Sequence, residues 1–568
     1  MNWLLLILLM GQSPGETPIT SSPSSTASPG NPENSNLSES PEPGAESSRN
    51  VTTEDSPDSG TGAKPRRHPF RAWRDPWDPA DWAKVPVLRP LPKPEYYVQL
   101  PVGEGYYSLW DRMRNLYREK PPKYPMPRVQ PMPLPFFDVD WKYLEGDVPE
   151  IERDLWDQFK RIHPTEDWAI SFGGEFRLRG DNIVSQFFRN FDENYWINRE
   201  RLYGDFWYRD AVRAYVEFIS AEKHGQNDPT IFTDINKADL LNAFFDLRID
   251  LDQADEKTYF RIGRQELYYG SQRLISALDW ANTRRTFQGV KILERSEKYD
   301  MDLFWVQPVV INPGQFDSVN AAVSFAGWWN TWRPATGMLG DFYVLNLNDN
   351  ANTATGEKGK PGGRNFTTTG LRAVYDKDGW FAEGEGMLQF GMWSNQAFFS
   401  QAASTGAGYT WQKVHGLPSL QVHYDFASGS KHPFLGTTNS TFQQLYPFGH
   451  YYFGYLDLVG RQNIHDISAQ FAWWPTHALQ FGFQSHQFYL DSPRDALYAA
   501  NGKKLRQDLS GKAGRNVGEE IDITTTYHLS NHQDVLVGWS QLWSGEFISK
   551  SGPATNPQYW YMQYSYRW

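Results

Sequence analysis

Basic residues recur at alternate positions along several segments of the chain. One residue separates Arg177 from Arg179, and one separates Arg199 from Arg201. A guanidinium group can bind a carboxylate through two parallel, charge-assisted hydrogen bonds, so such rows could hold acidic ligands. On the same alternation we expect these basic residues to share one strand face: Arg177, Arg179, Arg199, Arg201, Arg213, Arg248, Arg261, Lys291 and Arg372.

Carboxylates occupy the equivalent face in two settings. Later segments carry them alone, at Glu383, Glu385, Asp425, Asp466, Glu520 and Asp522. Earlier segments mix them with the arginines, at Glu175, Asp205, Glu217, Asp246 and Asp250. Opposite charges on neighbouring strands attract, so we expect about half of the arginines to form structural ion pairs. The remaining basic residues would make one side of this face electropositive.

Catalytic and metal-binding patterns are weak. His423 and Asp425 share a strand face, but no Gly-x-Ser-x-Gly elbow and no His-Glu-x-x-His motif is present. Glu383 and Glu385 could serve glycoside cleavage, although acidic pairs at this spacing are common on wet faces. Residues 348–350 offer oxygen ligands for calcium, and an ordinary polar loop explains them better. We expect no enzyme activity, no catalytic residue, no metal and no cofactor.

The elements that must position these side chains are β-strands. After Trp168 apolar and polar residues alternate with a period of two, as in residues 170–179, 212–218, 245–250 and 420–426. Alternating segments of about ten residues separated by turn residues are typical of strands in a membrane barrel.

The spacing of the connections predicts the number of strands. Short links are expected near 209–210, 253–256, 296–298, 333–336, 376–378, 415–416, 475–476 and 530–531. Long links are expected near 181–196, 223–239, 266–285, 312–320, 348–364, 392–405, 429–462, 491–514 and 544–556. Eight short and nine long links make 17 connections and therefore 18 strands. Alternation of short turns and long loops favours a closed up-and-down barrel in a bacterial outer membrane.

Composition excludes several other classes. The 568 residues include no Cys, which rules out disulfides and thiolate metal sites, and the net charge of −12 argues against a nucleic-acid partner. Only 39% of residues are hydrophobic while 16% are aromatic, so much aromatic surface should lie at an interface. Trp328, Trp329 and Trp393 could stack on sugars, but a girdle at the membrane boundary is the commoner role for Trp. A soluble propeller would show a repeat of about 40 residues, and none is found.

The first 165 residues differ from the rest. We predict a signal peptide over 1–15, a disordered Ser/Pro/Thr/Glu-rich leader over 16–65, a Pro/aromatic-rich segment over 66–165 and the barrel over 166–568. Short helices are expected near 109–118 and 149–162. The segment 66–165 could plug the pore, line its periplasmic mouth or bind a periplasmic partner.

Two blocks resemble the alginate-export outer-membrane porins. The first is residues 261–274 with its continuation at 279–289, and the second comprises 424–429, 441–447, 450–454 and 457–463. The resemblance implies an 18-stranded monomeric barrel that exports a polyuronate through a narrow electropositive pore. It implies pore-lining positions at Arg261, which the alternation also predicts, and at Arg264, Arg273, Arg284, Arg285 and Arg461.

The resemblance and the charge pattern together predict a passive outer-membrane channel for an anionic polysaccharide or oligosaccharide. Its partners would be that polysaccharide and outer-membrane lipid. Two alternatives remain open: an uptake porin for small acidic sugars, and a surface carbohydrate-binding protein displayed on a barrel.

Overall fold

The computed structural model describes Trp82 and residues 135–139, 141–145, 155–225, 233–249, 257–356, 359–414, 416–476, 479–530 and 532–568. Within these residues the main sheet has 20 strands, of which β8 (Ser318–Val319) and β15 (Thr438–Asn439) have two residues each. The other 18 are long and form the barrel wall. A separate hairpin joins β18 (Ala496–Tyr498) to β19 (Lys504–Gln507).

The wall strands are β1 (Trp168–Val184), β2 (Glu193–Tyr208), β3 (Val212–His224), β4 (Asn236–Ile249), β5 (Lys257–Gln265), β6 (Phe287–Arg295), β7 (Tyr299–Val310), β9 (Val323–Trp332), β10 (Met338–Thr355), β11 (Pro361–Lys377), β12 (Trp380–Trp393), β13 (Gln396–Thr410), β14 (Ser419–Ala427), β16 (Ile464–Thr476), β17 (Leu479–Leu490), β20 (Asn516–Ser530), β21 (Gln533–Ser544) and β22 (Gln558–Arg567). Two α-helices are described, α2 (Gly449–Tyr452) and α3 (Glu546–Ser551).

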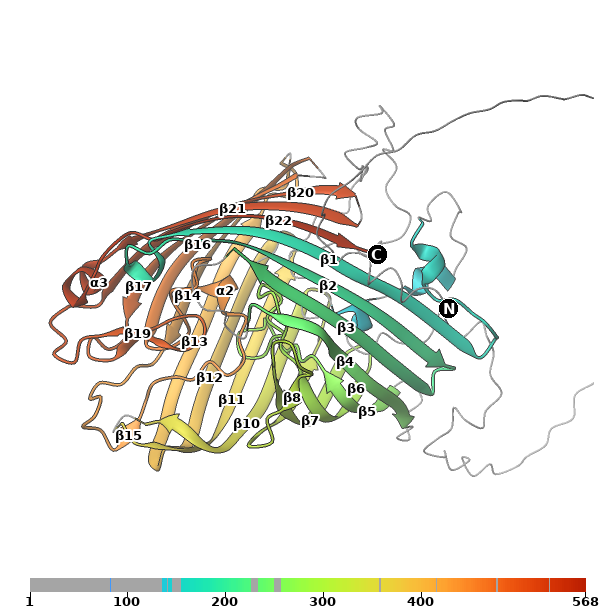
Figure 1. Ribbon diagram of the computed structural model, residues 1–568, viewed down its shortest axis with the longest axis horizontal. Coiled ribbons are helices and arrows are strands. Elements are labelled where there is room, and N and C mark those ends of the chain that lie inside the picture. Colours follow the sequence, from blue (N-terminus) through green and yellow to red (C-terminus); the bar gives the residue numbers. More distant parts are fainter. Residues whose placement is uncertain are drawn as a thin grey trace, which may run out of the picture. The chain divides into compact units, whose positions relative to one another are not determined.

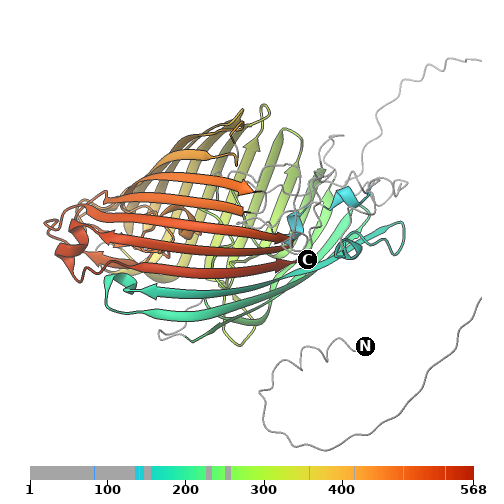
Figure 2. The same cartoon turned by 90° about the horizontal axis from the view of Figure 1, so that it is seen from above.

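The wall closes on itself. Each long strand pairs antiparallel with its neighbours along the chain, and β22 pairs with β1 from Glu175↔Arg567 to Val184↔Gln558. Figures 1 and 2 show the strands around a central lumen, with the C-terminus at one end and α3 at the other. The predicted antiparallel barrel of 18 strands is confirmed.

The two faces of the wall have opposite character. On β1 the side chains of Glu175, Arg177 and Arg179 are at most 4% exposed, whereas Phe172 is 42% exposed on the other face. Leu371 is 65% exposed on β11. Charges inside and apolar groups outside are the reverse of a soluble protein and the pattern of a barrel in lipid.

Most expected links are found, with one difference. Residues 348–364 and 392–405 were predicted as long links, but β10 continues to Thr355 and β13 begins at Gln396. The small polar residues there resemble a loop, yet they belong to paired strands with a polar inner face, as Gln389↔Ser400 shows. The long inward loops are 266–286 and 428–463, between β5 and β6 and between β14 and β16.

The N-terminal expectations are met only in part. The predicted helix over 149–162 is wrong in its described part, because Asp157–Phe159 forms a single 3-10 turn and Ile162 pairs with Ile170. Leu155 and Phe159 are 68% and 40% exposed, so these apolar residues do not form a buried helix face. The expected helix near 109–118 and the segments 1–15 and 16–65 lie outside the described residues. No helix in the described part of the chain is long and apolar enough to cross a membrane.

Candidate functional site

The inner face of β1 to β5 carries a row of arginines, most of which form ion pairs with carboxylates of a neighbouring strand. Arg199 Nη2 lies 2.6 Å from Glu175 Oε1, and Arg201 Nη2 lies 2.6 Å from Glu217 Oε1. Asp246 on β4 stands opposite both Arg213 on β3 and Arg261 on β5. We call Arg177, Arg179, Arg199, Arg201, Arg213 and Arg261 the basic wall.

Asp246 serves the two flanking arginines unequally. Arg261 donates two hydrogen bonds to it, at 2.6 and 2.9 Å. Arg213 lies 3.7 Å from it and instead binds Asp205 at 2.7 Å. These ion pairs are buried, so carboxylates of the wall compensate the charges of Arg261 and Arg213 without solvent.

Loop 266–286 folds into the lumen and meets the basic wall with its residues 279–281. Arg199 Nη2 binds Asp279 Oδ1 at 2.8 Å, and Arg284 from the same loop also binds this carboxylate. Arg177 donates to the carbonyl oxygens of Asp279 and Ala281, each at 2.6 Å. Arg179 lies 3.9 Å from the centroid of the Trp280 ring. The structure thus gathers four predicted residues, Arg177, Arg179, Arg199 and Arg284, around one short stretch of the loop.

The other part of this loop crosses to the acidic strands. Arg273 binds Glu383 and lies 3.0 Å from Glu385 Oε2, and both carboxylates come from β12. Tyr343 on β10 donates its hydroxyl to Glu385 Oε1 at 2.7 Å. Loop 266–286 therefore spans the lumen, with a carboxylate on the basic side and a guanidinium on the acidic side.

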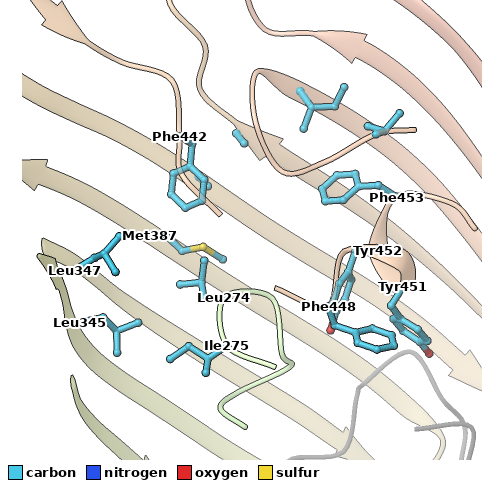
Figure 3. Packing of buried hydrophobic residues seen from close by; sticks show 14 of the residues in the cluster. Leu274, Ile275, Leu345, Leu347, Met387, Phe442, Phe448, Tyr451, Tyr452 and Phe453 are labelled. Carbon is cyan, nitrogen blue, oxygen red and sulfur yellow. The ribbon is translucent and has the colours of Figure 1, made fainter. Parts of the chain in front are cut away.

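Loop 428–463 packs against the first loop. Ser276 N donates to the Tyr446 carbonyl and Tyr446 N to the Leu274 carbonyl, both at 2.9 Å. His450 stacks on Trp280 with ring centroids 3.9 Å apart. Figure 3 shows Leu274 and Ile275 of the first loop near rings of the second loop and side chains of β10 and β12. The two loops form one packed body inside the barrel.

Arg461 and Arg285 belong to this body. Arg461 Nη1 donates to Asp425 Oδ1 on β14 at 2.6 Å. Arg285 donates to the carbonyls of Ser276 and Pro447 at 3.1 and 3.3 Å. Burial lowers the pKa of Arg285 to about 10, so its guanidinium is still charged at neutral pH. Both arginines hold the loops in place at positions away from Asp279.

The remaining predicted residues lie apart from this cluster. Arg248 binds Asp210 beside the β2–β3 turn, and Arg264 donates to the Leu240 carbonyl at 2.9 Å. Lys291 lies 3.8 Å from Asp302, and Arg372 binds Asp341.

Two features were not assigned from the sequence. Asp279 and Trp280 stand in the quoted motif, but a local pattern could not show that they face arginines about 80 to 104 residues away. Phe136 and Phe137 also enter the barrel, and their only sequence signal was the aromatic content of their segment.

A cavity of about 760 Å³ lies at the short-turn end between β7 and β11. The rings of Tyr269 and Trp329 form part of its wall, and of the three Trp residues considered for sugar stacking, only Trp329 lines it. Trp328 faces outward and is 41% exposed. The cavity has mixed charge, from Arg295, Lys298, Arg333 and Arg372 and from Glu297, Asp300, Asp302, Asp341 and Asp376.

The residues considered for other chemistry are engaged or placed differently. Asp425 binds Arg461 and Ser404, and His423 contacts Gln421 at 3.2 Å. Residues 348–350, expected in a loop, belong to β10. Among the described residues no group of three or more His, Asp or Glu is arranged to hold a metal ion.

An antiparallel barrel of 18 strands with a charged lumen and an apolar outer face is an outer-membrane channel of bacteria. The sequence profile of the family described as "Alginate export" matches residues 168–562, which is the barrel almost end to end. The chain belongs to this alginate export family.

Comparison with solved structures found barrels from Pseudomonas aeruginosa. OpdO has 12% sequence identity and a TM-score of 0.46, covering 71% of this chain and 98% of its own. OprD has 10% identity and a TM-score of 0.46, covering 70% and 93%. OccK11 (OpdR) has 10% identity and a TM-score of 0.42, covering 70% and 95%. A comparison with curated protein sequences found no match.

Proposed function

We propose that this channel passes an acidic polysaccharide or oligosaccharide, a polyuronate, whose carboxylates bind the basic wall one after another. The family's description supports an alginate-like substrate. Several weak arginine sites in series allow passage, whereas a single tight site would arrest the polymer. The process is passive, because a concentration gradient of the polymer drives it.

The observation that carries this proposal is the contact of Asp279 with the basic wall. Its carboxylate reaches Arg199 from a loop, whereas Glu175 and Glu217 reach the arginines from the wall itself. A carboxylate supplied by a loop can be exchanged for a carboxylate of the substrate. Arg177, which binds loop carbonyls, would also become available in that exchange.

Exchange explains why the substrate must be acidic. Leaving a buried charge without its partner costs about 3–5 kcal/mol. When loop 266–286 leaves the wall, Arg199 keeps Glu175 but Arg177 loses its carbonyl partners, so the loop can leave at low cost only when another anion takes the place of Asp279 beside Arg177. A neutral sugar offers hydroxyl groups, which compensate a guanidinium less well than a carboxylate does.

Loop arginines offset part of the charge of the acidic strands. Arg273 pairs with both Glu383 and Glu385 and offsets one of their two charges, and Arg461 pairs with Asp425. These pairs weaken the repulsion that a polyanion would otherwise meet on that side of the lumen.

The test is the reversal potential of the purified channel in a planar bilayer under a salt gradient. Arg177→Gln removes one charge of the basic wall, and we expect the anion-to-cation permeability ratio to fall at least about twofold. Arg209→Gln is the matched control, because Arg209 binds Asp167 beside the β2–β3 turn outside the basic wall. Equal ratios in the parent and Arg177→Gln would contradict the proposal.

A further inference from the structure

A short piece of the N-terminal segment lies inside the barrel on the basic wall. Phe136 stacks on Tyr203 with ring centroids 4.9 Å apart, and Phe137 packs edge-on against Phe244 at 5.3 Å. Phe136 and Phe137 are 8% and 4% exposed. Tyr203 and Phe244 lie near the short-turn ends of β2 and β4. This piece therefore sits in the periplasmic half of the lumen.

The same piece covers three arginines of the basic wall. The guanidinium of Arg201 lies 4.3 Å from the Phe136 ring centroid, and that of Arg261 lies 5.2 Å from the Phe137 centroid. Arg213 Nη2 donates to the Phe137 carbonyl at 2.7 Å. Cation–π contacts of this kind are favourable and leave the ion pairs beneath intact.

Trp82 makes a second contact nearer the barrel end. It is 2% exposed and packs in a cluster with Ala169, Trp207, Tyr259 and Leu293. Its ring nitrogen donates to the Glu166 carbonyl at 3.1 Å, and Arg161 donates to its carbonyl at 3.0 Å. Two separated points of the N-terminal segment thus seat on the inner face of the first strands.

The wall beneath is complete without this segment. Arg201, Arg213 and Arg261 keep Glu217, Asp205 and Asp246 as partners. Withdrawal of the rings would therefore leave no charge of the wall unpaired, whereas withdrawal of loop 266–286 would remove the carbonyl partners of Arg177. The segment can therefore leave this part of the basic wall without a large electrostatic cost.

The segment also changes which surface lines the inner mouth. While it is seated, it covers Arg201, Arg213 and Arg261, and the cavity of about 760 Å³ on the other side has carboxylates in excess over cations. An acidic polymer would find the arginines only after the segment has moved.

We propose that Phe136–Asp138 form an intramolecular plug seated on the basic wall, with Trp82 as a second contact point, and that displacement of these residues exposes the wall to the substrate. The plug shares its seat with the substrate, so a polyanion and the segment compete for it. The plug limits conduction through the channel, and in this respect the inference rests on the proposed function. The contact between the plug and the barrel wall can be tested separately.

Thiol labelling tests the seat without relying on conduction. The chain has no Cys, so Ala169→Cys places a single thiol under Trp82 with little change in volume. In lipid vesicles, a charged maleimide should label it at least about tenfold more slowly than Thr336→Cys, which lies exposed in the β9–β10 turn. Adding Trp82→Ala, Phe136→Ala and Phe137→Ala should remove the protection. Adding Leu155→Ala should preserve it, because Leu155 is 68% exposed.

Conductance of the full chain tests the consequence. The triple plug variant should conduct at least about twofold more than the parent and shift toward anions, and Leu155→Ala should match the parent. Fast labelling of Ala169→Cys in a chain with the plug residues intact would overturn the seat. If the thiol of the triple variant is labelled fast but its conductance equals that of the parent, the segment does not block the pore and the plug is overturned. Absence of conductance in every variant would overturn the proposed function, while labelling would still decide the seat. Slower migration after boiling confirms that each variant is folded.

Discussion

Individual arginines in the lumen have three kinds of partner, and these set what each one can do. Arg201 and Arg261 bind carboxylates of the wall, Arg273 and Arg461 reach from the loops to carboxylates of β12 and β14, and Arg177 binds loop carbonyls. The first kind stabilises the barrel, and the second fastens the loops. The third kind is the one whose partner can be replaced.

Arg273 offers a prediction at this scale. Arg273→Ala leaves Glu383 and Glu385 adjacent and without their cation, so we expect the free energy of unfolding to fall by about 3–5 kcal/mol. Urea unfolding in detergent, followed by tryptophan fluorescence, measures this. Arg209→Ala, which breaks a partly exposed pair, should cost at most about 1 kcal/mol. Similar small losses in both variants would show that Arg273 does not fasten the loop.

At the scale of elements, the channel depends on two loops that behave as one body. Loop 266–286 bridges the basic and acidic strands, and loop 428–463 holds it through backbone hydrogen bonds and the Trp280–His450 stack. The second loop is tied at its own start, where Gly429 N donates to Asp491 Oδ2 at 2.9 Å. Loop 266–286 can therefore leave the basic wall only if loop 428–463 also moves.

The Asp491 tie has a defined pH dependence. Burial raises the pKa of Asp491, but hydrogen bonds from His465 and the Gly429 amide and the charge of Arg515 outweigh it, so the pKa is lowered overall. A carboxyl whose folded pKa is lowered stabilises above its unfolded pKa of about 3.9, and this stabilisation is lost as pH falls through the folded pKa. Hydrogen exchange at Gly429 should thus stay slow from pH 7 to 5 and accelerate, after correction for intrinsic rates, only below about pH 4. Asp491→Asn should remove that step, and a step near pH 6 in the parent would contradict this assignment.

Strand alternation was sufficient to predict much of the element layout, and it failed for particular reasons. Strong apolar alternation such as that of residues 212–218 marked β3 well. The end of β10 and much of β13 consist of small or polar residues, whose pairing depends on the partner strand and not on their own sequence. The inward direction of loops 266–286 and 428–463 depends on contacts between distant residues, so local patterns could not predict it.

The whole molecule combines an apolar outer belt with a lumen whose charges are separated. Basic residues of β1 to β5 face acids on β12 to β20, and the loops bridge them. The alternation predicted which side chains face inward. It could not predict their partners, because each ion pair depends on register and on loops that return from far along the chain.

The outer belt provides a prediction for the complete barrel. Leu371→Arg places a charge on the lipid face of β11, where the native side chain is 65% exposed, and should lower the free energy of unfolding in lipid by about 2 kcal/mol. Leu435→Arg, at a position of loop 428–463 where the native side chain is 83% exposed, should change it little. Unfolding from vesicles distinguishes the two. Equal effects would argue against a lipid-facing position for Leu371.

In the proposed exchange, a carboxylate of the substrate replaces Asp279 on the basic wall. Single-channel block by a short oligouronate, compared with a neutral oligosaccharide of equal length, is the decisive measurement. The exchange predicts that the oligouronate blocks at least about tenfold more strongly than the neutral sugar. Asp279→Asn, which weakens the native competitor, should strengthen the acidic block several-fold. Equal block by both sugars, unchanged by Asp279→Asn, would contradict the exchange.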